Sequence, residues 1–226
     1  MRRRSVQLEL ALHTWGGRRA GAGRKPKGKR AGVPHRRRPL LAARYPVHVT
    51  LKLVRGLCEL RTAQMFRLIQ GALVAGRAKT DFRVCHFSVQ ADHIHLIVEA
   101  HDATALSRGI QGLGISIAKR INGALARRGR VFADRFHARI LRTPSEVRSA
   151  LDYVINNRAS HIQRLGVPHD LGLWMDPYSS AAYFDGWRRR PRRRPGRKWP
   201  PPVSPPRTWL LEKGWRRRGL LEPGRP

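Results

Sequence analysis

Acidic residues are scarce in this chain of 226 residues. Aspartate and glutamate together number 14, whereas lysine and arginine number 47, which gives a formal net charge of +33 at pH 7. Such an excess of positive charge indicates a polyanionic partner, and nucleic acid fits it better than a membrane surface does. We therefore expect the protein to bind nucleic acid.

Long apolar runs and cysteines are also scarce. No stretch approaches the roughly 20 apolar residues of a membrane-spanning helix, and Gln7 and Glu9 interrupt the apolar run near the N-terminus, which makes it a poor signal peptide. Without a secretory signal, Cys58 and Cys85 are typical of buried thiols in a reducing cytosol. We expect a cytoplasmic, nucleoid-associated protein with no membrane partner.

Positive charge is concentrated at the two ends of the chain. Residues 1–39 contain 13 lysines and arginines and one acid, and residues 186–226 contain 14 and two acids. Because glycine, arginine, lysine and proline dominate residues 16–39, this segment has almost nothing to bury. We expect a disordered basic arm at 1–39 and a basic, proline-rich tail at 188–226.

One folded domain is expected between these two ends. We place it at residues 40–165, because the apolar pattern begins at Leu40. A loop segment at 166–187, rich in glycine, proline and aromatic residues, is expected to pack on the core. Within the basic tail, residues 208–215 have the pattern of one short amphipathic turn that docks on the core.

Hydrophobic periodicity predicts the order of the secondary-structure elements. Alternating patterns predict strands, and apolar residues at steps of three and four predict amphipathic helices. The expected strands cover 45–53, 82–89, 93–100 and 137–141, and the expected helices cover 59–74, 103–127 and 144–158. The order β-α-β-β-α-β-α predicts an α+β fold, namely a ferredoxin-like β-α-β-β-α-β sandwich with an added C-terminal helix.

Two histidines open the third predicted strand. His93 and His95 are two residues apart, and side chains at that spacing point to the same face of a strand. Their imidazoles can therefore converge on one divalent metal. The alternative is a pair of ordinary histidines on a half-exposed strand, because His-x-His pairs are common. No role is expected for the other strand and loop histidines, which include His48 and His137.

A tyrosine and an asparagine share one face of the last predicted helix. This helix begins with a capping box between Thr143 and Glu146, and Tyr153 and Asn157 stand four residues apart within it. A phenol is a weak nucleophile at neutral pH, but a metal on the attacked phosphate would supply the missing electrophilicity. Asn157 offers an amide oxygen suited to Mg²⁺ or Mn²⁺. The alternatives are that Tyr153 packs on the sheet and that Asn157 ends the helix.

Four segments of the chain resemble the HUH single-tyrosine transposases, in particular the branch of REP-associated tyrosine transposases with its IS200-like domain. The segments are Val89 to Leu96, Ala118 to Asn122, Gly129 to Phe136 and Leu151 to Asn157, and the similarity covers about residues 45–161.

The resemblance implies a ferredoxin-like domain and a set of site residues. His93 and His95 would be metal ligands, Tyr153 the nucleophile and Asn157 the third, helix-borne ligand, with Mg²⁺ or Mn²⁺ as the cofactor. This chain differs from the family pattern before the histidines, where Ala91-Asp92 replaces a usual Pro-Asn pair. It also differs after Asn157, where arginine stands in place of proline.

These features predict a metal-dependent DNA transposase or endonuclease. It would cleave and rejoin single-stranded or hairpin DNA through a 5′-phosphotyrosine intermediate, and relatives of this kind often act as homodimers. One alternative is a catalytically silent, transposase-derived protein that binds structured DNA. An RNA-binding domain ranks last, because the strands lack the usual run of aromatic residues. The candidate phosphate-binding residues, each of which could equally lie on a solvated face, are Lys119, Arg120, Arg135 and Arg139.

Overall fold

A computed structural model describes residues 39–78, 81–164, 175–189 and 200–224, without the side chains of 158–164. The expected basic arm, apart from its last residue, lies outside the described residues, as do parts of the expected loop segment and tail. The helices and strands are β1 (Val47–Lys52), α1 (Ala63–Ala75), β2 (Phe82–Val89), β3 (His93–Ala100), α2 (Ala103–Ala124), β4 (His137–Ile140), α3 (Pro144–Arg164) and α4 (Trp209–Glu212). Short 3-10 helices cover Gly76–Ala78 (η1), Ala181–Tyr183 (η2) and Gly214–Arg218 (η3).

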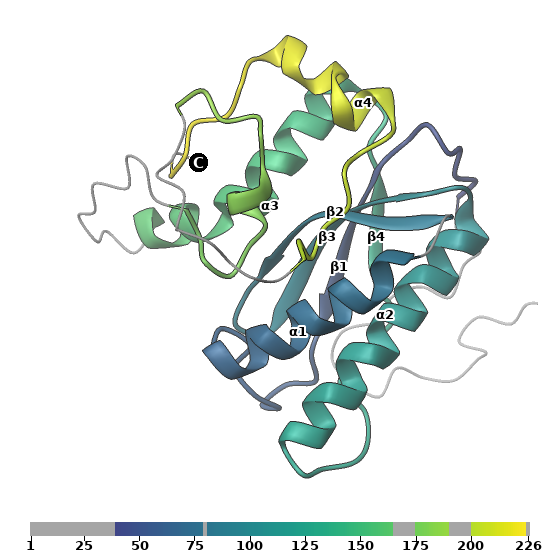
Figure 1. The fold of residues 1–226 in the computed structure, drawn as a ribbon, viewed down its shortest axis with the longest axis vertical. Helices are drawn as coiled ribbons and strands as arrows, with labels where there is room; N and C mark the ends of the chain where they lie inside the picture. The colour runs from purple at the N-terminus through teal and green to yellow at the C-terminus, as the bar shows by residue number, and fades with distance from the viewer. Residues whose placement is uncertain (1–38, 79–80, 165–174, 190–199, 225–226) are drawn as a thin grey trace, which may run out of the picture. The chain divides into compact units, whose positions relative to one another are not determined.

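The four strands form one antiparallel sheet in the order β2-β3-β1-β4. Helices α1 and α2 lie side by side on one face of the sheet, whereas α3 and the C-terminal residues lie on the other (Figure 1). The predicted combination of helices with a four-stranded antiparallel sheet, in the order β-α-β-β-α-β-α, is confirmed. No helix of the described segments is both long and apolar enough to cross a membrane.

Alternation along the strands produces one aliphatic face. Val49 of β1 and Leu96 of β3 are fully buried there, together with Ile117 and Ile121 of α2 and Ile69 of α1. Burying one such side chain contributes about 1.5–3 kcal/mol relative to leaving it in water. This layer therefore supplies much of the stability of the fold and fixes the register of β1 and β3.

Helix α3 differs from its predicted extent at the C-terminal end. Its start is as expected, because Thr143 Oγ1 accepts a hydrogen bond from the Glu146 amide at 3.2 Å and Glu146 Oε2 accepts one from the Thr143 amide at 3.1 Å. The helix continues to Arg164 instead of ending near residue 158. The physical reason is that no glycine or proline stands between Asn157 and Arg164, so nothing in the sequence stops the helix there. The alternative that Asn157 ends the helix is wrong.

The C-terminal residues are bound along the outer side of α3. Arg148 donates hydrogen bonds to the carbonyls of Gly219 and Leu220. About two helical turns later along α3, Asn156 Nδ2 donates to the carbonyl of Glu222 at 3.0 Å. Apolar contacts accompany these bonds, because the buried Trp215 belongs to the same cluster of side chains as the inner face of α3. Segments distant in the sequence thus hold α3 in place on the sheet.

Candidate active site

His93 and His95 lie on the face of β3 that α3 partly covers. Their Nε2 atoms are 3.0 Å apart, and the two rings are nearly perpendicular at 84°. The alternation on β3 produces this arrangement, since Ile94 and Leu96 point into the aliphatic layer on the opposite face. Two imidazole nitrogens that face each other in this way can bind the same cation.

The other nitrogen of each ring is held by a neighbouring polar group. His93 Nδ1 is 2.6 Å from Asp92 Oδ1, and this hydrogen bond is the main reason that the pKa of Asp92 lies below its usual value. His95 Nδ1 is 3.1 Å from Thr50 Oγ1 and 3.2 Å from His48 Nε2. Partners of this kind fix the orientation of ligand histidines and direct Nε2 toward the cation.

His48 and Thr50 are functional candidates that the sequence reasoning missed. Both project from β1 toward α3, and Thr50 is the direct cross-strand partner of His95. Burial, followed by the charges of His137 and Arg139, lowers the pKa of His48 to about 4, so its imidazole is neutral at physiological pH. The available signal was the alternation of β1, which places two polar residues on the face opposite its buried valines.

Tyr153 reaches the histidines from α3. Its hydroxyl is 3.5 Å from His95 Nε2, and its ring meets the rings of His95 and His48 edge to face. The side chain remains 50% exposed. A phenol that is open to solvent and lies beside two histidines can meet an incoming phosphate, whereas a tyrosine packed on the sheet could not.

Asn157 lies one helical turn beyond Tyr153 and is 2% exposed. Within the described part of the chain, neither its Oδ1 nor its Nδ2 has a hydrogen-bond partner. Buried amides without a partner are uncommon and call for an explanation. Two imidazole nitrogens and an amide oxygen are a donor set suited to Mn²⁺ or Mg²⁺. The described residues contain no group of three or more His, Cys, Asp or Glu side chains that could hold a metal. The role of Asn157 as a third ligand, of a different type, stays a prediction.

The candidate phosphate-binding residues fall into two groups. Arg139 on β4 is the cross-strand partner of His48, and Arg135 is exposed in the segment before β4. Lys119 and Arg120 are exposed on α2, which packs on the opposite face of the sheet, and the guanidinium of Arg120 lies against α1 at Gly71. The structure therefore places Arg139 on the side of the histidines and the α2 pair on the opposite side.

Part of the histidine face is left open beside Tyr153. The side chains that α3 buries against this face come from β2 and β3, such as Cys85 and Ile97. On the β1–β4 half, His48 and Thr50 are half-buried and His137 and Arg139 are exposed. This open half of the sheet is basic and polar, and it borders the tyrosine hydroxyl.

Residues 63–157 match the family of IS200-like transposases. The similarity inferred from the sequence is thereby confirmed for a segment that runs from the start of α1 to Asn157 and includes both histidines and Tyr153. No curated protein matches the chain.

Two solved structures are similar to this chain. A REP-associated tyrosine transposase bound to a REP hairpin has a TM-score of 0.49 and 18% sequence identity, and the match covers 66% of this chain and 82% of that one. A bacterial tRNA(His) guanylyltransferase (Thg1)-like protein in complex with GTP has a TM-score of 0.39 and 13% identity, with 59% and 74% of the two chains covered.

Proposed function

We propose that this protein is a metal-dependent DNA transposase that cleaves and rejoins single-stranded or hairpin DNA with Tyr153. The observation that carries the proposal is the half-exposed Tyr153, whose hydroxyl is 3.5 Å from His95 Nε2 in a segment that matches the IS200-like transposases. The strongly basic composition supports a DNA substrate.

Tyr153 acts as the nucleophile. Its Oη forms a bond to the phosphorus of the attacked phosphodiester, and the bond from phosphorus to the 3′ oxygen of the preceding nucleotide breaks. The phenolic proton passes to solvent, which reaches the half-exposed side chain, and the leaving oxygen takes up a proton to become a 3′-OH. The products are a 5′-phosphotyrosine and a free 3′-OH, and attack by another 3′-OH reverses the step.

The remaining site residues bind and orient. His93, His95 and Asn157 would hold Mg²⁺ or Mn²⁺, which when bound neutralises charge on the phosphate and polarises its oxygens. Thr50, His48 and Asp92 keep the two histidine rings in place through their outer nitrogens. Because its low pKa keeps His48 neutral at physiological pH, His48 does not repel a cation held by the histidine pair.

The DNA strand would lie on the open β1–β4 half of the histidine face. Arg139 is exposed there and bonds to Glu146 at 3.3 Å, an exposed pair that a phosphate can replace at little cost. Arg135 would reach the same strand from the segment before β4. The homodimer and the nucleoid-associated location expected from the sequence stay predictions.

Covalent capture of DNA tests the proposal. The full chain would be incubated with labelled hairpin and single-stranded DNAs and Mn²⁺ or Mg²⁺, and then separated on a denaturing gel. We expect a protease-sensitive shifted band that is lost with EDTA and with Tyr153→Phe. Tyr183→Phe is the matched control, because Tyr183 lies in η2, away from the histidine pair, and this variant should form the band normally.

Two outcomes would contradict the proposal. A band that persists in Tyr153→Phe would assign the nucleophile to another residue. Tight DNA binding without any band, across a library of hairpins, would favour a catalytically silent protein that binds structured DNA.

A further inference from the structure

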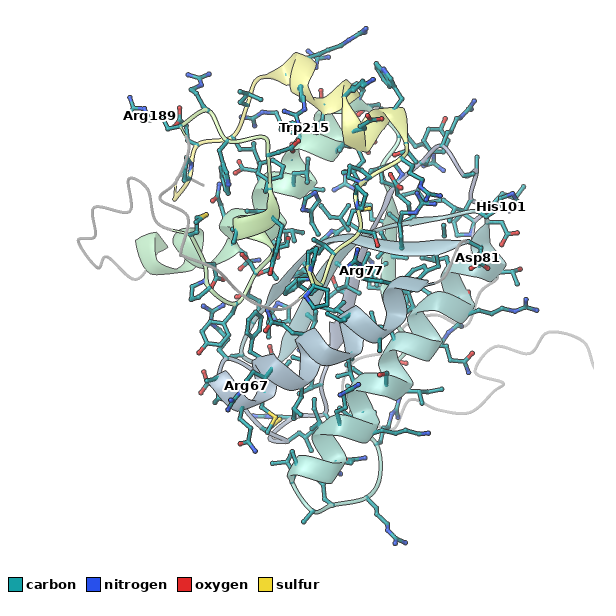
Figure 2. The ribbon with its side chains drawn as sticks, viewed as in Figure 1. Arg67, Arg77, Asp81, His101, Arg189 and Trp215 are labelled. Atoms are coloured by element: carbon teal, nitrogen blue, oxygen red, sulfur yellow. The ribbon has the colours of Figure 1, made fainter. Side chains whose placement is uncertain are left out.

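A second basic site lies at the other end of the sheet, where β2 begins and β3 ends. It is a groove of about 600 Å³ whose lining includes Arg44, Arg207 and Trp209. Asp81 and His101 stand beside each other at its rim, joined by a backbone hydrogen bond of 3.0 Å (Figure 2). The groove is separate from the histidine pair, because His93 opens β3 whereas Ala100 at its far end lines the groove.

The charges of the groove favour an anionic ligand. Glu99, the buried acid of the lining, has its carboxylate occupied by the amides of Arg207 and Thr208 at 2.9–3.1 Å and by Arg83 at 3.5 Å. This leaves Asp81 as the exposed acid of the described lining, beside the exposed Arg44 and Arg207. Further positive charge adjoins the groove in η3, where the exposed Arg217 lies against Trp209 of the lining.

Trp209 offers an aromatic surface in the same groove. It begins α4, is 49% exposed, and is held in place because Thr208 caps the helix and donates its hydroxyl to Glu99 at 2.8 Å. The ring packs closely over Gly214, where an added Cβ would come within 2.6 Å of it, and the Arg217 guanidinium lies 5.0 Å from its centre. In proteins that bind single strands, unpaired bases stack on exposed aromatic rings, and neighbouring arginines bind the backbone phosphates. Trp209 and its arginine neighbours have this arrangement.

The groove lies at the end of β3 that is next to the start of β1. Because β1 runs antiparallel to β3, the start of β1 lies beside the end of β3, with Val47 opposite Val98. Arg44 precedes this end of β1 and stands only four residues before His48, which contacts His95 and Tyr153. From His95 to Ala100 the strand covers ~17 Å, a length of about five stacked nucleotides.

We propose that this groove binds an unpaired nucleotide of the DNA strand on which Tyr153 acts, with the base on Trp209 and phosphates on Arg44 and Arg207. The proposal rests on the proposed function and adds a second contact to it, several nucleotides away from the attacked phosphate. The groove would thereby distinguish a hairpin with a single-stranded extension from a blunt hairpin.

Binding of two DNA probes tests the groove without the chemical step. The full chain with Tyr153→Phe would be titrated, in EDTA, against a labelled blunt hairpin and against hairpins with a graded series of unpaired extensions. Adding Trp209→Ala should weaken binding of long extensions by about tenfold and leave the blunt hairpin unchanged. Trp209→Phe keeps a ring for stacking and should therefore lose less affinity for the long extensions than Trp209→Ala does. Ile115→Ala is the matched control, because Ile115 is a half-exposed apolar residue of α2 on the opposite layer.

Crosslinking and charge removal provide independent readouts. A photoreactive deoxyuridine placed at successive unpaired positions should crosslink to the peptide that contains Trp209, several nucleotides from the position that Tyr153 captures. Arg207→Gln should weaken binding of extended hairpins and reduce its salt dependence, whereas Arg108→Gln on α2 should not. Arg207→Gln keeps the backbone amide that bonds to Glu99, so we expect this variant to fold normally. It therefore tests the groove even if Trp209→Ala is poorly folded.

The outcomes separate the two proposals. If Trp209→Ala and Arg207→Gln bind extended hairpins as well as the parent does, or if they lose affinity equally for blunt hairpins, the groove is not a site for an unpaired nucleotide. A groove that captures another protein chain would give that result. Covalent capture by Tyr153 that fails while extension binding still requires Trp209 would overturn the proposed chemistry but not the groove.

Discussion

The two faces of the sheet are made from the same strands but carry different chemistry. On the face covered by α1 and α2, the strands present side chains such as Val49, Leu96 and Val98, all fully buried. On the face toward α3, the neighbouring positions carry His48 and His95, whose ring nitrogens form a polar network. Adjacent residues on one strand thus serve stability and site chemistry separately.

The difference shows how a polar candidate site can share its strands with a well-packed core. Since side chains alternate along a strand, a buried leucine on one face fixes the position of the histidine beside it on the other. The aliphatic face needs complete coverage by helices, and α1 and α2 supply it. The histidine face needs access, and α3 provides it by leaving the β1–β4 half open.

Replacing a histidine should affect chemistry far more than folding. We expect His95→Ala to lower the rate of covalent DNA capture by on the order of a hundredfold or more, because it removes a candidate ligand and the neighbour of the Tyr153 hydroxyl. The midpoint of denaturant unfolding should change little. Single-turnover assays at saturating Mn²⁺ would measure the rate, and a variant that captures DNA normally would remove His95 from the site.

The adjacent residue should show the reverse pattern. Leu96→Ala on the aliphatic face should lower the free energy of unfolding by about 2–5 kcal/mol, since it leaves a cavity among fully buried side chains. Urea unfolding followed by circular dichroism would measure the loss. While the variant remains folded, its affinity for Mn²⁺ should equal that of the parent, and a parallel loss of metal affinity would show that the two faces are not independent.

A buried histidine under the C-terminal segment should make stability depend on pH. Burial lowers the pKa of His86 to about 4 despite the opposing charge of Asp185. Between pH 6.5 and 4 the unfolded chain binds a proton at this position that the folded chain does not, so the free energy of unfolding falls as pH falls. The decrease from this group should reach up to about 3 kcal/mol.

Urea unfolding at a series of pH values would measure that decrease. His86→Gln should flatten the pH dependence in this range and leave stability at pH 8 closer to that of the parent. An unchanged slope in the variant would assign the acid sensitivity to other groups.

Removing a supporting residue should have a smaller effect than removing a ligand. We expect His48→Ala to weaken Mn²⁺ binding by about tenfold to a hundredfold, because His95 would lose one partner of its Nδ1 atom. Isothermal titration calorimetry would measure the affinity. His137→Ala is the control, since His137 is exposed on β4 and makes no hydrogen bond to the histidine pair in the described structure. Equal losses in both variants would argue for a general charge effect.

The smallest effect is expected at the start of α3. Glu146→Ala should lower the free energy of unfolding by about 1 kcal/mol, because the carboxylate accepts hydrogen bonds from the amides of Arg142 and Thr143. Thermal or urea unfolding would measure it. Arg139→Ala removes only the exposed ion pair with Glu146 and should cost less. If the two variants were equally destabilised, the ion pair and not the capping box would hold this end of the helix.

Local patterns in the sequence predicted much of the fold and part of the candidate site. The bounds of β2 and β3 agree with the structure, because alternating apolar residues and a short polar break mark them clearly. His93, His95, Tyr153 and Asn157 were predicted as one site from spacing and family similarity, and the structure places the histidines and the tyrosine in contact.

Residues that meet the candidate site only through contacts across the sheet were missed. Thr50 and His48 lie far from His95 in sequence, and only the register of β1 on β3 makes them neighbours. Lys119 and Arg120 were grouped with the site because they are basic, although α2 carries them on the other face.

The sequence by itself determined the alternating pattern of the strands, the three-and-four-residue pattern of the helices and the capped start of α3. It also determined the positive charge of the chain. Each of these depends on residues that are close together or on composition alone. Tertiary structure alone decided which half of the histidine face stays open and how Tyr153 meets His95. It also decided that residues 207–224 dock on Glu99 and α3. These outcomes depend on packing between segments separated by scores of residues, and no local pattern specifies which distant surface a segment will cover.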